Sequence, residues 1–380
     1  MNITPHLFDD QYDHTVLVLQ GGGALGAYQA GVYEGLIEAG FSPDWVTGVS
    51  IGAINAALIA GNPPNMRVTR LREFWDRVSS SSTLLVPLFS GPMRPALSRV
   101  SAVASVTLGV PGFFSPRGMG GMLAPKGSAA ATSFYDTQPL KSTLEELVDF
   151  DLINEAKVRL SIGAVNIVTG NSLYFDNRDD DHTPLCAEHI MASGALPPAF
   201  APVQIGDDFF WDGGIVSNTP LTYVLEQDPH MDALVVQVDL FSARGPLPVN
   251  LDQVMERHKD IMYSSKTRFN TKRVAELQNL KNAFVRLEKK LPAKLKSDPD
   301  FKLLLAQCNN ARIDIVHLIN RRYDYTSHFK DYEFSRATVR SLWESGLEDV
   351  RASLGHPVWL KGDDVGGGMR IFDLTQHQRD

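Results

Sequence analysis

Two short apolar runs, each followed by glycine and a helix-like segment, most constrain the fold of this chain. Val16 to Leu19 is rich in strand formers and leads into the glycine-rich stretch Gly21 to Gly26. A continuous apolar run of this kind is typical of a strand buried on both faces, as in parallel sheets. Residues 27–39 are then expected to form a helix, residues 45–49 a strand and residues 51–60 a helix. This order predicts an open α/β sheet.

Regular signals return beyond the middle of the chain. Residues 158–168 and 172–175 are expected to form two strands joined by a turn at Thr169-Gly170-Asn171. Residues 188–195 are expected to form a short helix, and residues 233–240 another buried strand. Together with the first four elements, these segments place a main domain over residues 15–248.

The pattern changes after Pro248. Apolar residues recur there at spacings of three and four, which predicts an amphipathic helix; they are Val274, Leu277, Leu280, Phe284, Leu287 and Leu291. Helical pattern returns over residues 335–354. We expect a helical C-terminal region over residues 249–362 and a loosely ordered tail over residues 363–380.

An irregular insert interrupts the main domain at residues 77–135. It contains no acidic residue, and Leu88-Phe89 and Phe113-Phe114 within it look exposed. A long insert of this kind is usually either functional or disordered. Two interpretations stay open: a lid that rests on an anionic bilayer surface, or an irregular excursion packed on the core.

Composition excludes several classes of protein. The net charge of −8 argues against a general nucleic-acid binder, and two cysteines, Cys186 and Cys308, do not make a disulfide framework. No Lys or Arg precedes Arg67, so a secretory signal is not expected. Because no apolar run reaches about 18 residues, no transmembrane helix is expected either. We therefore expect a cytoplasmic protein or one bound at the membrane periphery.

The segment Gly48-Val49-Ser50-Ile51-Gly52 fits the pattern G-x-S-x-G. In this pattern the serine lies on a sharp strand-to-helix turn, and the glycines remove side chains that would collide there. The helix that follows directs its N-terminal N–H groups, including that of Ile51, towards an oxyanion. Because the match lies between a predicted strand and a predicted helix, Ser50 is our candidate nucleophile.

The glycine-rich loop from Gly21 to Gly26 has two interpretations. It fits G-x-G-x-x-G, the dinucleotide fingerprint, but the acidic residue at a suitable separation, Asp44, precedes the next strand instead of ending it. Alternatively, its backbone N–H groups converge on an oxyanion. The candidate donors are those of Gly21, Gly22, Gly23, Ala24 and Ile51.

No histidine motif indicates which residue is the general base that deprotonates Ser50. The downstream histidines His230, His258, His317 and His328 lack glycine or turn context. Ser50 also follows a single strand-helix unit, whereas the nucleophile of a conventional α/β-hydrolase follows several more strands. A different kind of serine hydrolase is therefore indicated.

Three motifs in order resemble the patatin-like phospholipases: the glycine-rich loop, G-x-S-x-G and Asp212-Gly213-Gly214. The block from Ala192 to Pro197 resembles the family segment that shortly precedes its aspartate. The resemblance covers roughly Thr15 to Asp239, and it implies a three-layer α/β/α fold around a mostly parallel sheet. It also implies a serine–aspartate dyad without histidine. Many relatives carry Arg or Lys where this chain has Leu25, which weakens the expected preference for anionic head groups.

On this resemblance, Asp212 is the candidate base and a lipid or other acyl ester is the expected substrate. A carboxylate within reach of Ser50 can accept its proton, and burial beside Trp211 would raise its proton affinity. The motif glycines are Gly26, Gly48, Gly52, Gly213 and Gly214. No cofactor or metal is expected, since no H-E-x-x-H or Cys/His cluster occurs. A dinucleotide-binding module and a catalytically silent scaffold remain the alternatives.

Overall fold

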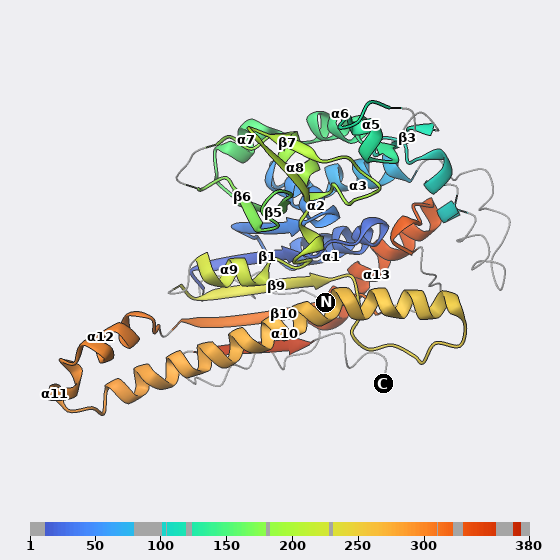
Figure 1. Cartoon of the computed structure of the whole chain (residues 1–380). Coiled ribbons are helices and arrows are strands. Elements are labelled where there is room, and N and C mark those ends of the chain that lie inside the picture. Colours follow the sequence, from blue (N-terminus) through green and yellow to red (C-terminus); the bar gives the residue numbers. More distant parts are fainter. Residues whose placement is uncertain are drawn as a thin grey trace.

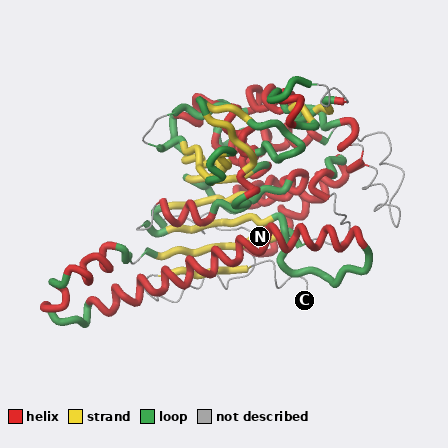
Figure 2. The backbone as a smooth tube through the Cα atoms, in the orientation of Figure 1, coloured by secondary structure: helices red, strands yellow, loops and turns green. Residues whose placement is uncertain are grey.

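A nine-stranded sheet forms the centre of the computed structural model, which describes residues 12–79, 101–103, 105–118, 124–179, 183–227, 231–309, 311–321, 330–354 and 368–373. The side chains of residues 265–270 are not included in that description. The strands follow the order β11-β10-β9-β1-β2-β5-β8-β7, and β6 pairs with β5. Figure 2 shows these strands side by side, with helices on both sides of them.

Six neighbouring strands of this sheet are parallel, and three at one end are antiparallel. The parallel strands are β1 (His14–Leu19), β2 (Trp45–Val49), β5 (Arg159–Asn166), β9 (Ala233–Asp239), β10 (Arg312–Ile319) and β11 (Gly368–Asp373). The antiparallel strands are β6 (Ser172–Asp176), β7 (Val203–Ile205) and β8 (Asp208–Asp212). The carboxyl ends of the parallel strands therefore meet at one edge, where open α/β sheets bind ligands.

Helices cover both faces of the sheet, and each face has its own core (Figure 1). Alternate residues of β1 divide between the two cores, with Leu17 and Leu19 in one and Val16 and Val18 in the other, as the two-residue repeat of a strand requires. The first core includes side chains of α1 (Gly26–Glu38), α2 (Ile51–Ala60), α3 (Arg67–Val78) and α13 (Arg336–Leu354). The second includes those of α9 (Leu221–Gln227) and α10 (Leu251–Glu288).

The remaining elements are short. Before α10 they are η1 (Gly23–Leu25), β3 (Ser115–Pro116), α5 (Ala129–Thr132), β4 (Tyr135–Asp136), α6 (Gln138–Leu147), α7 (Phe150–Asn154), α8 (Ala187–Ser193) and η5 (Gly213–Ile215). Beyond α10 they are α11 (Ala293–Lys296), α12 (Pro299–Ala306) and η6 (Lys330–Tyr332). Figure 1 shows α10 continuing past the sheet to α11 and α12, which form a projecting arm.

The predicted fold class is confirmed: the fold is α/β, with a central, mostly parallel sheet between helical layers and helices in the C-terminal region. The C-terminal region also supplies two strands that the sequence analysis did not predict, β10 and β11. They extend the same sheet from β9, and β11 lies within the tail that was expected to be loosely ordered. The domain boundary at residue 248 stays a prediction.

One expectation about the insert is wrong. Phe113 and Phe114 look exposed in the sequence, but they are 8% and 4% exposed in the structure. They are buried because their rings pack on each other and on Phe200, with centroids 5.4 to 6.2 Å apart. The pair Leu88-Phe89 lies outside the described residues. Whether the insert acts as a lid stays a prediction.

The last long helix packs against the first. Tyr28 of α1 donates a hydrogen bond to Asp349 of α13 at 2.8 Å, and Arg351 pairs with Glu38 at 2.8 Å. This contact explains why α1 is buried on nearly all sides, although a surface helix exposes one face. In the part of the chain that the structure describes, no helix is both long enough and apolar enough to cross a bilayer.

Candidate active site

Ser50 occupies a sharp turn between β2 and α2. Its backbone has φ 57° and ψ −125°, a conformation that costs a non-glycine residue roughly 1–3 kcal/mol. A Cβ atom on Gly48 would lie 2.3 Å from the backbone of Gly52, and one on Gly52 would lie 2.3 Å from the carbonyl oxygen of Leu19. Both motif glycines are therefore needed for the turn to pack against β1.

A second serine fixes the backbone of this turn. The N–H of Ser50 donates a hydrogen bond to Oγ of Ser193 at 3.0 Å, and Ser193 Oγ donates to the carbonyl of Gly163 at 2.7 Å. Ser193 lies at the end of α8 and is fully buried. Its hydroxyl thus links the nucleophile turn to the middle of β5. The sequence analysis included this residue in a family-like block without assigning it a role.

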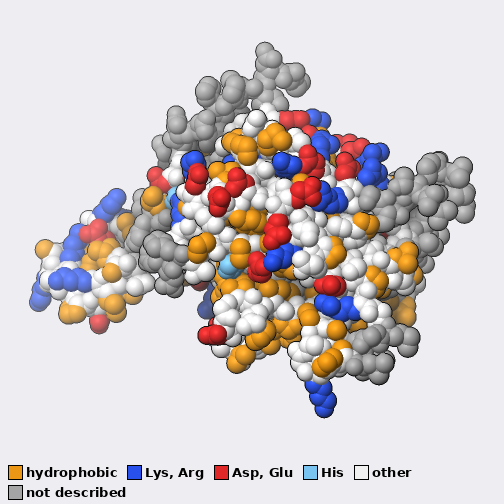
Figure 3. Space-filling view, turned by 90° about the horizontal axis from the view of Figure 1, so that it is seen from above, with side chains coloured by type: hydrophobic (Ala, Val, Ile, Leu, Met, Phe, Trp, Pro, Cys, Tyr) orange, Lys and Arg blue, Asp and Glu red, His pale blue; other side chains and the backbone are white. Residues whose placement is uncertain are grey.

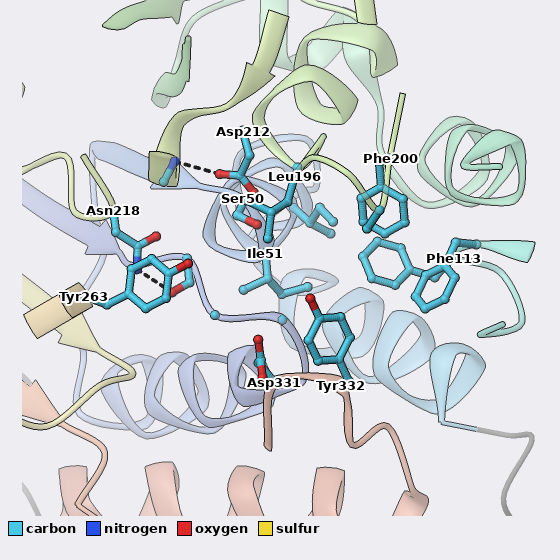
Figure 4. A pocket seen from close by; sticks show the side chains of 18 of the residues that line it. Ser50, Ile51, Phe113, Leu196, Phe200, Asp212, Asn218, Tyr263, Asp331 and Tyr332 are labelled. Atoms are coloured by element: carbon cyan, nitrogen blue, oxygen red, sulfur yellow. Dashed lines mark hydrogen bonds between the residues drawn. The ribbon is translucent and has the colours of Figure 1, made fainter. Parts of the chain in front are cut away.

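Asp212 lies at the end of β8, beside Ser50 (Figure 4). Its side chain is almost completely buried, and its Oδ1 accepts a hydrogen bond from the N–H of Gly214 at 2.7 Å. Burial raises the pKa of this carboxyl to about 6, while the Gly214 N–H and a hydrogen bond with Ser50 act in the opposite direction. The two predicted dyad residues therefore lie side by side, and the raised pKa favours proton exchange by this carboxyl near neutral pH.

The glycine-rich loop lies at the carboxyl end of β1, next to Ser50. Gly21, Gly22 and Gly23 line the cavity that contains the dyad. The N–H of Gly21 donates to the carbonyl of Asn218 at 3.2 Å, and Ala24 is buried without lining that cavity. The geometry therefore does not support these two as oxyanion donors.

The other three predicted donors are better placed. Within the described residues, the N–H groups of Gly22, Gly23 and Ile51 have no hydrogen-bond acceptor, as is usual for the first N–H groups of a helix. All three residues line the cavity. The remaining motif glycines support the surroundings, since a Cβ atom on Gly26 would lie 2.5 Å from Ile51 and one on Gly213 would lie 2.6 Å from the carbonyl of Gly163.

Two buried amides hold the loop in place. Asn218 donates through Nδ2 to the carbonyl of Gly21 at 2.9 Å. The carbonyl of the Gln20 side chain accepts from the N–H groups of Leu240 and Phe241 at 2.6 and 3.2 Å. The loop is thus tied to the segments that follow η5 and β9. Neither amide belongs to a motif, so these roles could not be predicted from local patterns.

The cavity around the dyad encloses roughly 730 Å³, part of which opens to solvent. Its apolar wall contains Phe113, Phe114, Phe200 and Phe334. The polar groups Tyr263, Asp331 and Tyr332 come from α10 and η6, so the C-terminal region completes the site.

Other candidate residues lie elsewhere. Asp44, the acid that a dinucleotide site would use, accepts from the N–H of Thr15 at 3.2 Å, at the amino ends of β1 and β2 and thus at the opposite edge of the sheet from the glycine loop. His258 and His317 do not line the cavity, and His230 and His328 lie outside the described residues. Among the residues that the structure describes, no group of three or more His, Cys, Asp or Glu side chains could hold a metal ion.

Family models match most of the chain. Residues 17–225 match the model described as "Patatin-like phospholipase". Residues 261–365 match a second model, described as "Patatin phospholipase". The first match contains Ser50, Asp212 and the glycine-rich loop, and the second contains Tyr263, Asp331 and Tyr332.

Individual proteins give weaker likenesses. A "cGAMP-activated phospholipase" of Pseudomonas aeruginosa is 30% identical over 114 residues, which span 27% of this chain and 34%, about a third, of the relative. VipD of Legionella pneumophila is similar over 88% of this chain and 67% of its own, with 13% identity and a TM-score of 0.34. The type III effector ExoU is similar over 90% and 53%, with 13% identity and a TM-score of 0.29.

Proposed function

The chain belongs to the patatin-like phospholipase family, and from that premise we propose that it is a serine hydrolase that cleaves fatty-acyl ester bonds of lipids. One observation carries the proposal. Ser50, held in a strained turn at a helix N-terminus, lies beside the buried carboxyl of Asp212, whose pKa is raised (Figure 4). A nucleophile beside a base of suitable pKa is the arrangement that acyl transfer needs.

Acylation uses the two side chains and the loop. Ser50 Oγ attacks the ester carbonyl carbon, and Asp212 takes the hydroxyl proton. The N–H groups of Gly22, Gly23 and Ile51 stabilise the oxyanion, and such donors are usually worth about 100- to 1000-fold in rate each. When the tetrahedral intermediate collapses, the bond to the alcohol oxygen breaks. Asp212 then donates its proton to the departing alcohol, which leaves an acyl ester on Ser50.

Deacylation repeats these steps with water. A water molecule attacks the acyl carbonyl while Asp212 accepts one of its protons. The bond between the acyl carbon and Ser50 Oγ breaks, the fatty acid leaves, and the proton returns to Ser50. No histidine is used, in agreement with the absence of a histidine among the described residues that line the cavity.

The first experiment measures p-nitrophenol release from acyl esters of increasing chain length. Ser50→Ala and Asp212→Asn should each lower kcat by about a thousandfold or more, with circular dichroism unchanged. Matched controls are Ser142→Ala and Asp208→Asn, since both residues are exposed and do not line the cavity. Equal activity in the dyad variants and in these controls would refute the dyad.

A covalent probe tests the acyl-enzyme directly. An alkyl fluorophosphonate transfers its phosphonyl group to a nucleophilic serine and releases fluoride. Mass spectrometry should locate the adduct on the peptide that contains Ser50, and Ser50→Ala should remove it. If the probe labels another serine and Ser50→Ala keeps its turnover, the nucleophile is that other serine and not Ser50.

We further propose a peripheral contact with the membrane, through the residues that lead into α10 and through the first residue of that helix. Leu247, Val249 and Leu251 are 88%, 82% and 73% exposed, whereas large apolar side chains in a row are unusual on a soluble surface. The segment lies in the chain between Phe241 and Tyr263, which both line the cavity. Insertion of these side chains into a bilayer would therefore bring the cavity to its lipid substrate.

A further inference from the structure

The cavity around Ser50 has two chemically different sides. Figure 4 shows Phe113 and Phe200 on one side of Ser50, and Tyr263 and Asn218 on the other. On the first side, aromatic rings pack with centroids 5.4 to 6.2 Å apart and form an apolar wall. An acyl chain gains from burial against such a wall. A polar leaving alcohol would have to desolvate its oxygens there without compensation.

The polar side is supplied by the C-terminal region. Tyr263 lies on α10, and Asp331 and Tyr332 lie on η6. All three are outside the segment that matches the first family model and inside the segment that matches the second. The segment that matches the first family model therefore does not contain this part of the cavity. The segment that matches the second model supplies it.

Ion pairs hold η6 on α10 at this place. Lys259 donates to both carboxylate oxygens of Asp331, at 2.8 and 2.9 Å. Lys330 pairs with Asp260 at 2.6 Å and with Glu256 at 3.3 Å, and the carboxylates of both partners are at most 7% exposed. Since a buried charge is costly without its partner, η6 is fixed relative to α10.

The same segment touches the glycine-rich loop. A Cβ atom on Gly23 would lie 2.2 Å from the carbonyl oxygen of Asp331, and Gly23 itself has φ 57°. The loop and η6 are thus in backbone contact beside Ser50. Tyr263 and Tyr332 line the cavity on either side of Asp331 (Figure 4).

Both phenols stay protonated and can donate hydrogen bonds. Burial is the main cause that raises the pKa of Tyr263 and of Tyr332, and the negative charges of Asp212 and Asp331 act in the same direction. A protonated phenol can donate to an ether, ester or hydroxyl oxygen.

The charged side chains that line the cavity further restrict which leaving alcohol can bind there. The charged side chains among the described residues that line the cavity are two carboxylates, Asp212 and Asp331. Lys259 neutralises Asp331, and none of the described residues that line the cavity is a Lys or Arg. A phosphate would therefore have no cation to bind in the cavity, whereas an uncharged polyol needs none.

We propose that Tyr263 and Tyr332 form the subsite for the leaving alcohol, and that this alcohol is an uncharged, glycerol-type one whose oxygens accept hydrogen bonds from the two phenols. The aromatic wall takes the acyl chain. The proposal rests on the hydrolase function proposed above, and it names the determinant of specificity on the alcohol side of the same site.

The experiment compares two esters of one fatty acid: a 1-acylglycerol and a p-nitrophenyl ester, which has no polyol. Tyr263→Phe and Tyr332→Phe should each lower kcat/KM about three- to tenfold for the acylglycerol, as expected for a lost neutral hydrogen bond. The p-nitrophenyl ester should change less than about twofold. The matched control is Tyr223→Phe, because the Tyr223 hydroxyl bonds to Asp176 at 2.9 Å and does not line the cavity.

Three outcomes would overturn the subsite while leaving the hydrolase proposal intact. One is an equal loss on both esters in the tyrosine variants. Another is an altered chain-length preference in Tyr263→Phe, a change that we expect of Phe200→Ala instead. The third is a wild-type kcat/KM for 1-acylglycerol 3-phosphate that equals or exceeds that for the acylglycerol. If wild type turns over neither ester, and the fluorophosphonate does not label Ser50, the hydrolase proposal itself fails.

Discussion

Ser193 fixes the backbone of the nucleophile Ser50: its hydroxyl accepts a hydrogen bond from the N–H of Ser50 at 3.0 Å and donates one to the carbonyl of Gly163 at 2.7 Å. Since Ser50 has a positive φ, its turn needs surroundings that compensate the strain. The hydrogen bond also commits the N–H of Ser50, so the oxyanion must use other donors.

Ser193→Ala should therefore lower both activity and stability. Loss of this buried partner leaves the N–H of Ser50 unsatisfied, which costs roughly 1–3 kcal/mol. We expect kcat to fall about 10- to 100-fold, since a displaced nucleophile loses its alignment with the carbonyl, while KM changes little. Steady-state kinetics and urea denaturation measure the two effects.

Ser345→Ala is the matched control for this variant. Ser345 is fully buried on α13, and its hydroxyl has no hydrogen-bond partner among the described residues. Its removal should leave kcat unchanged and stability equal or slightly higher. Equal kinetics of Ser193→Ala and wild type would show that the turn holds its shape without this tether.

The pH dependence of the reaction should follow the carboxyl of Asp212. The unprotonated form is the base, and burial raises the pKa to about 6. The value of kcat/KM, which reports the free enzyme, should thus rise with pH through about 6 and level off above pH 7. A profile already flat from pH 4.5 upward would mean that Asp212 is not the base.

The same carboxyl should make the folded state less stable at high pH. Its pKa is 3.8 ordinarily and about 6 in the fold, so the protein gains the full benefit of the protonated carboxyl below pH 4. That benefit is lost as pH rises through about 6, when the buried group must ionise. The difference of about two pH units corresponds to roughly 3 kcal/mol.

Asp212→Asn should consequently unfold at higher urea concentration than wild type at pH 8, and at a similar concentration at pH 4. An amide oxygen can still accept from Gly214, so the loop keeps its hydrogen bond. Greater stability with no activity is the trade-off expected at a catalytic site. A variant less stable than wild type at pH 8 would indicate that the carboxylate is better solvated than its burial implies.

Local rules predicted the first half of the fold well. The strand, glycine loop and helix around Ser50 were predicted from adjacent residues, because each element and its turn obey rules that act over a few positions. Ser50 and Asp212 lie side by side in the structure, but the aspartate was identified through a family resemblance and not through spacing. The acid lies at the end of an antiparallel strand, and no local pattern indicates that placement.

The rest of the site depends on contacts between distant parts of the chain. Tyr263 and Tyr332 reach the cavity because β10 and β11 extend the sheet and α13 packs on α1. The strand β10 lacks the continuous apolar run of β1, because Asp314 and His317 interrupt it. The sequence analysis therefore assigned this region to helices. Similarly, Phe113 and Phe114 look exposed until Phe200 covers them.

The salt bridge of Lys330 predicts a strong effect of a single substitution. Lys330→Met removes the cation that pairs with the buried carboxylate of Asp260. We expect a loss of roughly 3 kcal/mol in the free energy of unfolding at pH 7.5, and faster hydrogen exchange in residues 330–335.

Lys272→Met supplies the control for that experiment. Lys272 pairs with Glu276 at 3.8 Å, and both side chains are well exposed, so the change should be below about 0.5 kcal/mol. If Lys330→Met is as mild as this control, η6 is held by its other contacts. The alcohol subsite would then not depend on the ion pairs.

Membrane contact should be separable from catalysis. Replacing Leu247, Val249 and Leu251 together by Glu adds three charges to an exposed segment, so folding should be unaffected. Each apolar side chain that no longer inserts removes roughly 1.5–3 kcal/mol of burial at most. The triple variant should therefore sediment with anionic vesicles at least about tenfold less than wild type, and hydrolyse vesicle lipids correspondingly more slowly. Its kcat on a short, soluble p-nitrophenyl ester should remain unchanged.

The projecting arm provides the comparison, because it also combines apolar and basic side chains. Leu280 and Leu303 are 68% and 65% exposed on α10 and α12, and Figure 3 shows Lys and Arg beside hydrophobic side chains at that end of the molecule. The arm projects from the far end of α10, away from the part that carries Tyr263 (Figure 1). A Leu280→Glu, Leu303→Glu variant should bind vesicles as wild type does, since contact there would hold the cavity away from the lipid. Loss of binding in this variant, with binding intact in the triple variant, would move the membrane contact to the arm.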